Sequence, residues 1–201
     1  MNLLPKNPKM DRDERYEMII EKSRELFGRF GFKKTTMDEI ANACGIGKAT
    51  LYYYFENKQD IFRSVIKKEF EMFKEKISEV LSGIEEPHDR LKAFILARVT
   101  RVEEVSNYYS TIRDEYMENY AFIEKERKDF INWEITTIKT ILDEGIQKGI
   151  FKDMDTEITA TVLAFSLKGL EFPWIIRQYI IDIEKAVDLM LPILFKGLDK
   201  R

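Results

Sequence analysis

Apolar residues recur at intervals of three and four along nearly the whole chain of 201 residues, which is the spacing of one face of an α-helix. Alternating apolar and polar runs, which half-buried strands require, are missing. The pattern therefore predicts an all-α protein of about nine helices. The expected helices cover residues 12–30, 36–44, 48–54, 57–81, 88–104, 106–119, 123–149, 156–172 and 182–197.

Charge is unevenly distributed along the chain. The segment from Arg29 to Lys68 holds eight basic and four acidic residues, a net charge of +4, whereas the whole chain carries −3. A basic segment on an acidic body is typical of a protein that meets phosphate with one face only. We predict a flexible leader at residues 1–10, a small front domain at 11–70 and a larger rear domain at 71–201, joined inside a helix near Phe70.

Residue counts exclude several classes of function. Cys44 is the only cysteine and His88 the only histidine, so an internal disulfide, a zinc site and a histidine-based catalytic relay are not expected. We predict no enzyme activity, no metal and no cofactor, and we expect His88 at the surface. No apolar run approaches the roughly 18 residues of a membrane span, and residues 1–10 lack the apolar core of a signal peptide. The expected compartment is the reducing cytoplasm.

The stretch from Thr35 to Phe55 has the pattern of a helix-turn-helix. Thr36 and Glu39 have the spacing of a capping box, in which each side chain satisfies a free backbone N–H at a helix start. Ala41 is a small residue where a second helix would cross, and Gly45 suits the turn. These features predict two short helices packed closely against each other.

The second of these helices carries three adjacent tyrosines. Successive helical residues are about 100° apart, so three neighbouring rings cannot all point into the core. We expect Leu51 and Phe55 to be buried. A phenol donates well to phosphate, and its ring can lie on a sugar or a thymine methyl. The predicted outer face consists of Lys48, Thr50, Tyr52, Tyr53 and Tyr54.

From about Arg12 to Phe70, roughly a third of the chain, the sequence resembles the TetR family of regulators. Cys44 stands where that family usually has valine or alanine, and it is a small apolar substitute. The resemblance rests on Phe27-Gly28-Arg29-Phe30-Gly31-Phe32, Thr35-Thr36, Glu39-Ile40-Ala41, Gly45-Ile46, Leu51-Tyr52-Tyr53-Tyr54-Phe55 and Asn57-Lys58.

This resemblance implies a homodimeric repressor that binds a pseudo-palindromic operator in double-stranded DNA and is released by a small ligand. Thr36, Tyr53 and Lys58 would hold phosphates, and Tyr54 would lie against the DNA backbone. The residues implied nearest the base edges are Lys48, Ala49, Thr50 and Tyr52.

The rear half is rich in aromatic residues, which makes a pocket for an apolar or amphipathic ligand plausible, although a solid core would look the same. Arg98 and Arg113 lie among apolar neighbours and are candidate partners of an anionic group. The full candidate ligand set is Arg98, Tyr109, Arg113, Tyr116, Trp133 and Phe165.

Members of the family usually dimerise through their last two helices. The matching face here consists of Val162, Phe165, Ser166, Gly169, Leu189, Ile193 and Leu194.

Two alternatives remain open on the sequence alone. The chain could be an all-α ligand carrier or enzyme with a front that merely resembles a helix-turn-helix, although no convergent catalytic set is visible. It could also be an architectural DNA-binding protein that responds to no ligand, which would leave the aromatic rear half unexplained.

Overall fold

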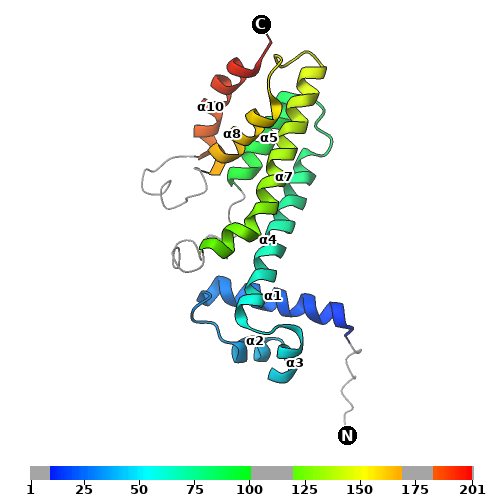
Figure 1. Cartoon of the computed structure of the whole chain (residues 1–201), viewed down its shortest axis with the longest axis vertical. Coiled ribbons are helices and arrows are strands. Elements are labelled where there is room, and N and C mark those ends of the chain that lie inside the picture. The colour runs from blue at the N-terminus through cyan, green and yellow to red at the C-terminus, as the bar shows by residue number, and fades with distance from the viewer. Residues whose placement is uncertain (1–9, 101–119, 169–182, 201) are drawn as a thin grey trace. The chain divides into compact units, whose positions relative to one another are not determined.

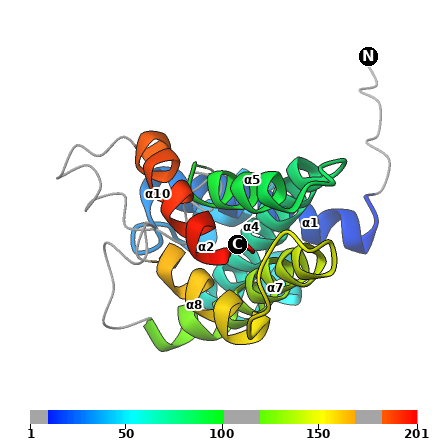
Figure 2. The same ribbon diagram turned by 90° about the horizontal axis from the view of Figure 1, so that it is seen from above.

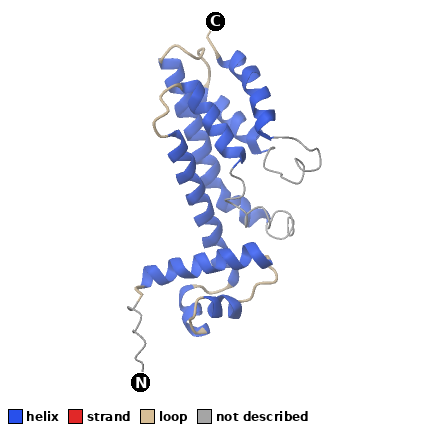
Figure 3. Ribbon diagram, turned by 180° about the vertical axis from the view of Figure 1, so that it is seen from behind, coloured by secondary structure: helices blue, strands red, loops and turns tan. Residues whose placement is uncertain are grey.

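The computed structural model describes residues 10–100, 120–168 and 183–200, and these residues are almost entirely helical (Figures 1 and 3). The all-α prediction is confirmed, and the helices begin and end within a few residues of the expected positions. The helix expected at 106–119 lies outside the described residues. The described helices are α1 (Arg12–Phe30), α2 (Met37–Ala43), α3 (Lys48–Tyr54), α4 (Lys58–Leu81), α5 (Pro87–Thr100), α7 (Tyr120–Gln147), α8 (Thr156–Lys168) and α10 (Ile183–Leu198).

Helix α1 begins at a capping box that the sequence reading had not identified. The backbone N–H of Glu14 donates to Oδ1 of Asp11 at 2.8 Å, and the backbone N–H of Asp11 donates to Oε2 of Glu14 at 2.9 Å. The helix ends before Gly31, whose φ of 82° lies in the region that favours glycine. These two ends fix the length of α1. Its buried face consists of Ile19, Ile20, Ser23 and Phe27.

The described residues form two compact units. Residues 10–69 belong to the front unit, and residues 70–100, 122–168 and 183–200 belong to the rear unit, so α4 contributes its first half to one and its second half to the other. In the front unit, Phe32 contacts both Phe27 and Phe62, with ring centroids 5.6 and 4.8 Å apart. This aromatic cluster joins α1, the loop after it and the start of α4.

In the rear unit, α5 packs against both α8 and α10 (Figure 2). The end of α10 is tied to the loop after α7, because Lys152 donates its backbone N–H to the carbonyl of Leu198 at 2.8 Å and Lys200 donates to that of Ile150 at 3.0 Å. Phe151 between them is buried against α7, and a Cβ at Gly145 would lie 2.1 Å from its ring. Glycine is therefore required at that point.

His88, expected at the surface, is only 30% exposed and closes this end of the rear unit. Its Nε2 lies 2.7 Å from Oδ1 of Asp199, and its Nδ1 lies 3.2 Å from Oε1 of Glu86. The rings of Phe151 and Phe195 meet it edge to face at 5.1 and 4.7 Å. His88 is thus partly exposed, and these contacts could not be predicted because its partner Asp199 is 111 residues away in the chain.

Candidate nucleic-acid interface

Helix α2 begins at the predicted capping box, which the structure confirms. The backbone N–H of Glu39 donates to Oγ1 of Thr36 at 3.2 Å, and the backbone N–H of Thr36 donates to Oε2 of Glu39 at 2.8 Å. Thr36 and Glu39 are both exposed. The start of α2 is therefore well ordered by its own side chains while remaining open to solvent.

The turn between α2 and α3 has the geometry that the glycine predicted. Gly45 has a φ of 64°, where a side chain would be strained. The backbone N–H groups of Gly45 and Ile46 return to the carbonyls of Asn42 and Ala41 at 3.1 and 3.0 Å. These bonds satisfy the last carbonyls of α2 and set the angle at which α3 leaves it.

Helix α3 divides its residues between core and solvent as expected. Leu51 is fully buried, and Phe55 is 5% exposed and stacks on Tyr16 with ring centroids 5.1 Å apart. Tyr52 is 46% exposed and Tyr53 is 71% exposed. Exposing two large rings to water has no benefit for folding, so these positions are available for contact with a partner. The rest of the outer face consists of exposed Lys48 and Ala49 with half-buried Thr50 and Tyr54.

Lys48 lies at the start of α3 and is held by α2. Its Nζ is 2.8 Å from Oδ1 of Asp38, and both side chains are more than half exposed. The hydrogen bond to Asp38 raises the pKa of Lys48 above its ordinary value. A phosphate or base that binds Lys48 would compete with this carboxylate.

Lys58, the first residue of α4, points back at the loop that precedes α2. Its Nζ donates to the carbonyls of Phe32 at 2.7 Å, Lys33 at 3.3 Å and Thr35 at 2.9 Å. The same nitrogen lies 4.4 Å from the centroid of the Phe32 ring. The phosphate contact expected for Lys58 would have to replace at least one of these bonds.

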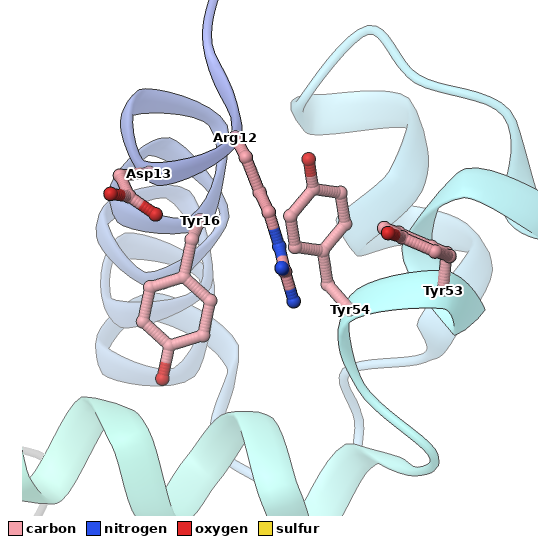
Figure 4. Close-up of a pocket in the computed structure, with 5 residues that line it drawn as sticks. All are labelled: Arg12, Asp13, Tyr16, Tyr53 and Tyr54. Atoms are coloured by element: carbon pink, nitrogen blue, oxygen red, sulfur yellow. The ribbon is translucent and has the colours of Figure 1, made fainter.

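A pocket of about 280 Å³ opens between the start of α1 and the end of α3 (Figure 4). It is lined by Arg12, Asp13, Tyr16, Tyr53 and Tyr54, and the Arg12 side chain extends between Tyr16 and Tyr54 (Figure 4). The guanidinium carbon of Arg12 lies 5.9 Å from the centroid of the Tyr53 ring. Sequence reasoning missed Arg12, since nothing in its local pattern indicates that α3 ends beside it.

Of the six candidate ligand residues, the three that the structure describes lie on three different helices. Arg98 on α5 is 2% exposed and forms an ion pair with Glu134 on α7, which is 1% exposed. Trp133 is half-buried, with its ring 6.2 Å from that of Phe94. Phe165 on α8 is 54% exposed, on the surface and not in the interior. Tyr109, Arg113 and Tyr116 lie outside the described residues.

Helices α8 and α10 present large apolar side chains to solvent. Ser166 beside them is exposed and Leu194 is half-buried, whereas Gly169 lies outside the described residues. The surface that we name the α8/α10 face consists of Ile158, Val162 and Phe165 on α8, and of Leu189, Met190 and Ile193 on α10, all at least 37% exposed.

The described residues contain no group of three or more His, Cys, Asp and Glu side chains arranged to hold a metal ion. Among the helices they form, none combines the length and the apolar character needed to cross a membrane.

Residues 19–65 match the family model described as "Bacterial regulatory proteins, tetR family". This segment contains most of α1, all of α2 and α3, and the start of α4. It therefore coincides with the helix-turn-helix described above.

Similarity to known proteins extends over most of the chain. The sequence is 28% identical over 189 residues to the HTH-type transcriptional regulator YhgD of Bacillus subtilis, covering 92% of this chain and 97% of YhgD. The fold is similar to that of the transcriptional regulator FadR of Bacillus subtilis, solved with stearoyl-CoA, at a TM-score of 0.69 and 21% identity, covering 90% and 98% of the two chains. It is also similar to AibR, solved with isovaleryl coenzyme A and operator DNA, at a TM-score of 0.58 and 27% identity, covering 90% and 98%.

The all-α fold, the capped α2, the glycine turn and the exposed tyrosines of α3 agree with these similarities. The DNA-binding segment is the part that matches the family model. Residues 19–65 thus match the TetR family model, and the chain is similar to bacterial transcriptional regulators over most of its length.

Proposed function

We propose that the protein is a repressor that acts in the cytoplasm by binding and not by catalysis. It binds a pseudo-palindromic operator as a homodimer and leaves it when an acyl thioester binds the rear unit. The observation that carries this proposal is the outer face of α3, where Tyr52 and Tyr53 are 46% and 71% exposed while Leu51 on the opposite face is fully buried.

In this proposal α3 enters the major groove, a geometry that brings the first residues of a recognition helix to the base edges. Lys48, Ala49, Thr50 and Tyr52 read bases there. The remaining DNA contacts, to the backbone, come from Thr36, Tyr53, Tyr54 and Lys58.

The α8/α10 face supports the homodimer. A single short helix reads too few bases to select one site in a genome, so two copies related by a two-fold axis are needed. An exposed apolar patch of this kind is typical of a subunit interface. In the proposed dimer the two α3 helices bind successive major grooves, about 34 Å apart.

A charge on this face tests the dimer. Ile193 is 76% exposed, so Ile193→Glu adds a charge without disturbing the core. We expect sedimentation to show monomers and operator binding to be lost. Thr136→Glu, an equal charge at an exposed position of α7, is the matched control and stays dimeric. A parent protein that is monomeric at micromolar concentration would contradict the proposal.

The ligand class is inferred from the rear unit and from the relatives. The similar structures of FadR and AibR hold stearoyl-CoA and isovaleryl coenzyme A, respectively. In the described part of the rear unit, the rings of Phe70 and Phe73 stack on that of Phe130 at 4.8 and 5.5 Å, and Arg98 forms a buried ion pair with Glu134. Apolar walls with few polar groups suit an amphipathic ligand. An acyl thioester has an apolar chain and a polar anionic head, which fits this description.

Binding linkage provides the test of release. If an acyl-CoA weakens operator binding by some factor, the operator must weaken acyl-CoA binding by the same factor. We would titrate acyl-CoAs of short and long chain, with coenzyme A alone as the control, with and without operator. We expect acyl-CoA to weaken operator binding and the operator to weaken acyl-CoA binding by the same factor. Binding of acyl-CoA by a protein that never binds DNA would favour the ligand-carrier alternative.

A further inference from the structure

Asp38 on α2 places a carboxylate on the proposed DNA-binding surface, against the first residue of α3. Nζ of Lys48 lies 2.8 Å from Oδ1 and 3.1 Å from Oδ2 of Asp38. Helices α2 and α3 pack against each other, and the pair joins them on their solvent-exposed side. A surface ion pair of this kind adds little to the stability of a fold. Its main consequence is therefore for the charge that this surface presents.

Both residues are held at fixed places in the front unit. Asp38 lies in the first turn of α2, directly after its capping box. Lys48 begins α3 just after the turn at Gly45. Tyr52 follows Lys48 by four residues, so it lies one turn further along the same face of α3. Asp38 thus contacts the lysine that shares a face with an exposed tyrosine.

An ion-paired lysine meets DNA differently from a lysine without a carboxylate beside it. Non-specific binding comes from the charge that a protein brings to the phosphates, and the Asp38–Lys48 pair brings no net charge. Lys48 has three N–H donors and the carboxylate has two oxygens, so one donor remains for a base acceptor such as O6 or N7 of guanine. The pair therefore weakens the attraction to phosphates of any sequence and keeps a hydrogen bond that depends on sequence.

We propose that Asp38 is a specificity-determining residue, which neutralises Lys48 on DNA of the wrong sequence and leaves one of its donors for an operator base. This inference rests on the proposed function, in which Lys48 reads bases. A regulator meets non-specific sites in large excess, so the ratio of operator affinity to non-specific affinity decides where it binds. Specificity can be raised by making the wrong partners bind worse, and this is the role of Asp38.

Asp38→Asn removes the charge and keeps the size of the side chain. We expect binding to random duplex at about 100 mM salt to strengthen by about three- to tenfold, and the slope of log K against log salt to steepen by about one unit. At the operator this gain is offset, because Lys48 is no longer held by Asp38 and must be ordered on binding. Operator affinity should stay within about twofold of the parent. An unchanged ratio of operator to random-duplex affinity would overturn the proposal.

Glu17→Gln is the matched control for net charge. Glu17 on α1 lies 3.1 Å from Nζ of Lys68 in the same front unit, and the two side chains are 55% and 37% exposed. Lys68 is ten residues along α4 from Lys58, a rise of about 15 Å from the DNA-binding end. We expect Glu17→Gln to leave the affinity ratio within about twofold of the parent. An equal fall of the ratio in both variants would show an effect of net charge alone and refute the role of Asp38.

Base preference gives a readout that general electrostatics would not move. Selection from a random DNA pool with Lys48→Met identifies the operator position that Lys48 reads, as the one whose preference is lost. We expect Asp38→Asn to weaken the preference at that position by about threefold and to leave the other positions unchanged. Preferences that are unaltered in Asp38→Asn, or altered only at other positions, would overturn the proposal.

The ion pair can be measured without DNA, which keeps the inference separate from the proposed function. The hydrogen bond to Asp38 is the main cause that raises the pKa of Lys48. We expect NMR titration to show this pKa falling in Asp38→Asn, while the pKa of Lys139, raised by its hydrogen bond to Asp143, stays unchanged. An unchanged pKa of Lys48 would overturn the inference. A parent protein that binds no operator would refute the proposed function and leave the titration result standing.

Discussion

Breaking the buried ion pair of the rear unit should destabilise the protein strongly. Arg98 and Glu134 are 2% and 1% exposed, so water cannot replace a lost partner. The guanidinium carbon of Arg98 also lies 5.5 and 5.2 Å from the ring centroids of Phe73 and Phe130. Arg98→Met leaves the Glu134 carboxylate buried without this partner. Removal of one member of a buried pair costs about 3–5 kcal/mol, a large part of the 5–15 kcal/mol that typically holds a domain folded.

Replacing both members should be far less harmful than replacing one. In Arg98→Met/Glu134→Leu no charge of the pair remains to be desolvated, and apolar replacements of buried pairs are often neutral or stabilising. The double variant should recover most of the loss, so the two substitutions are strongly non-additive. The assay is urea unfolding followed by circular dichroism.

An exposed ion pair in the same unit provides the control. Lys92 on α5 and Asp188 on α10 are 3.1 Å apart with side chains 46% and 59% exposed. Lys92→Met should cost less than about 1 kcal/mol. The reasoning is refuted if Arg98→Met costs as little as Lys92→Met, or if the losses from the two buried substitutions simply add.

Two further predictions concern the end of the rear unit where α10 closes. Gly145→Ala would place a methyl group 2.1 Å from the Phe151 ring. Such overpacking should lower the free energy of unfolding in urea by about 1–3 kcal/mol. A urea midpoint equal to that of the parent would contradict this close contact. Burial works to lower the pKa of His88, but hydrogen bonds to Asp199 and Glu86 outweigh it, so the pKa is raised above its ordinary value. Because the folded protein binds this proton more tightly, the stabilisation is complete below the unfolded pKa of about 6.5 and is lost as pH rises through the higher folded pKa. The stability difference between the parent and His88→Gln should therefore shrink with rising pH, and a constant difference would rule out this linkage.

Local patterns predicted the front unit well. Helical spacing located α1 to α4, and the Thr36-to-Glu39 spacing located the start of α2, because a capping box involves neighbouring residues. The exposure of Tyr52 and Tyr53 followed from the angle between successive helical residues. These features depend only on residues close together in the chain.

Contacts between residues that are distant in the chain could not be predicted from the sequence. Arg98 looked like a candidate for an anionic ligand, but its partner Glu134 is 36 residues away. Lys58 remains a predicted phosphate contact, and the carbonyls that accept from it in the structure lie 23 to 26 residues earlier. Backbone carbonyls occur at every residue and leave no signal in a sequence, so which lysine they bind becomes clear only in the fold.

The most direct test of the central claim is the selection of bound duplexes from a random DNA pool. We expect the parent to select an inverted repeat, read by two copies of α3. Tyr52→Ala should change the preferred base at one or two symmetric positions, by about 1–3 kcal/mol, because the proposed complex places Tyr52 at the base edges. Tyr53→Ala, on the same helix, should weaken binding without changing the selected sequence. A selected motif without two-fold symmetry, or one left unaltered by Tyr52→Ala, would contradict the assignment of α3 as the recognition helix.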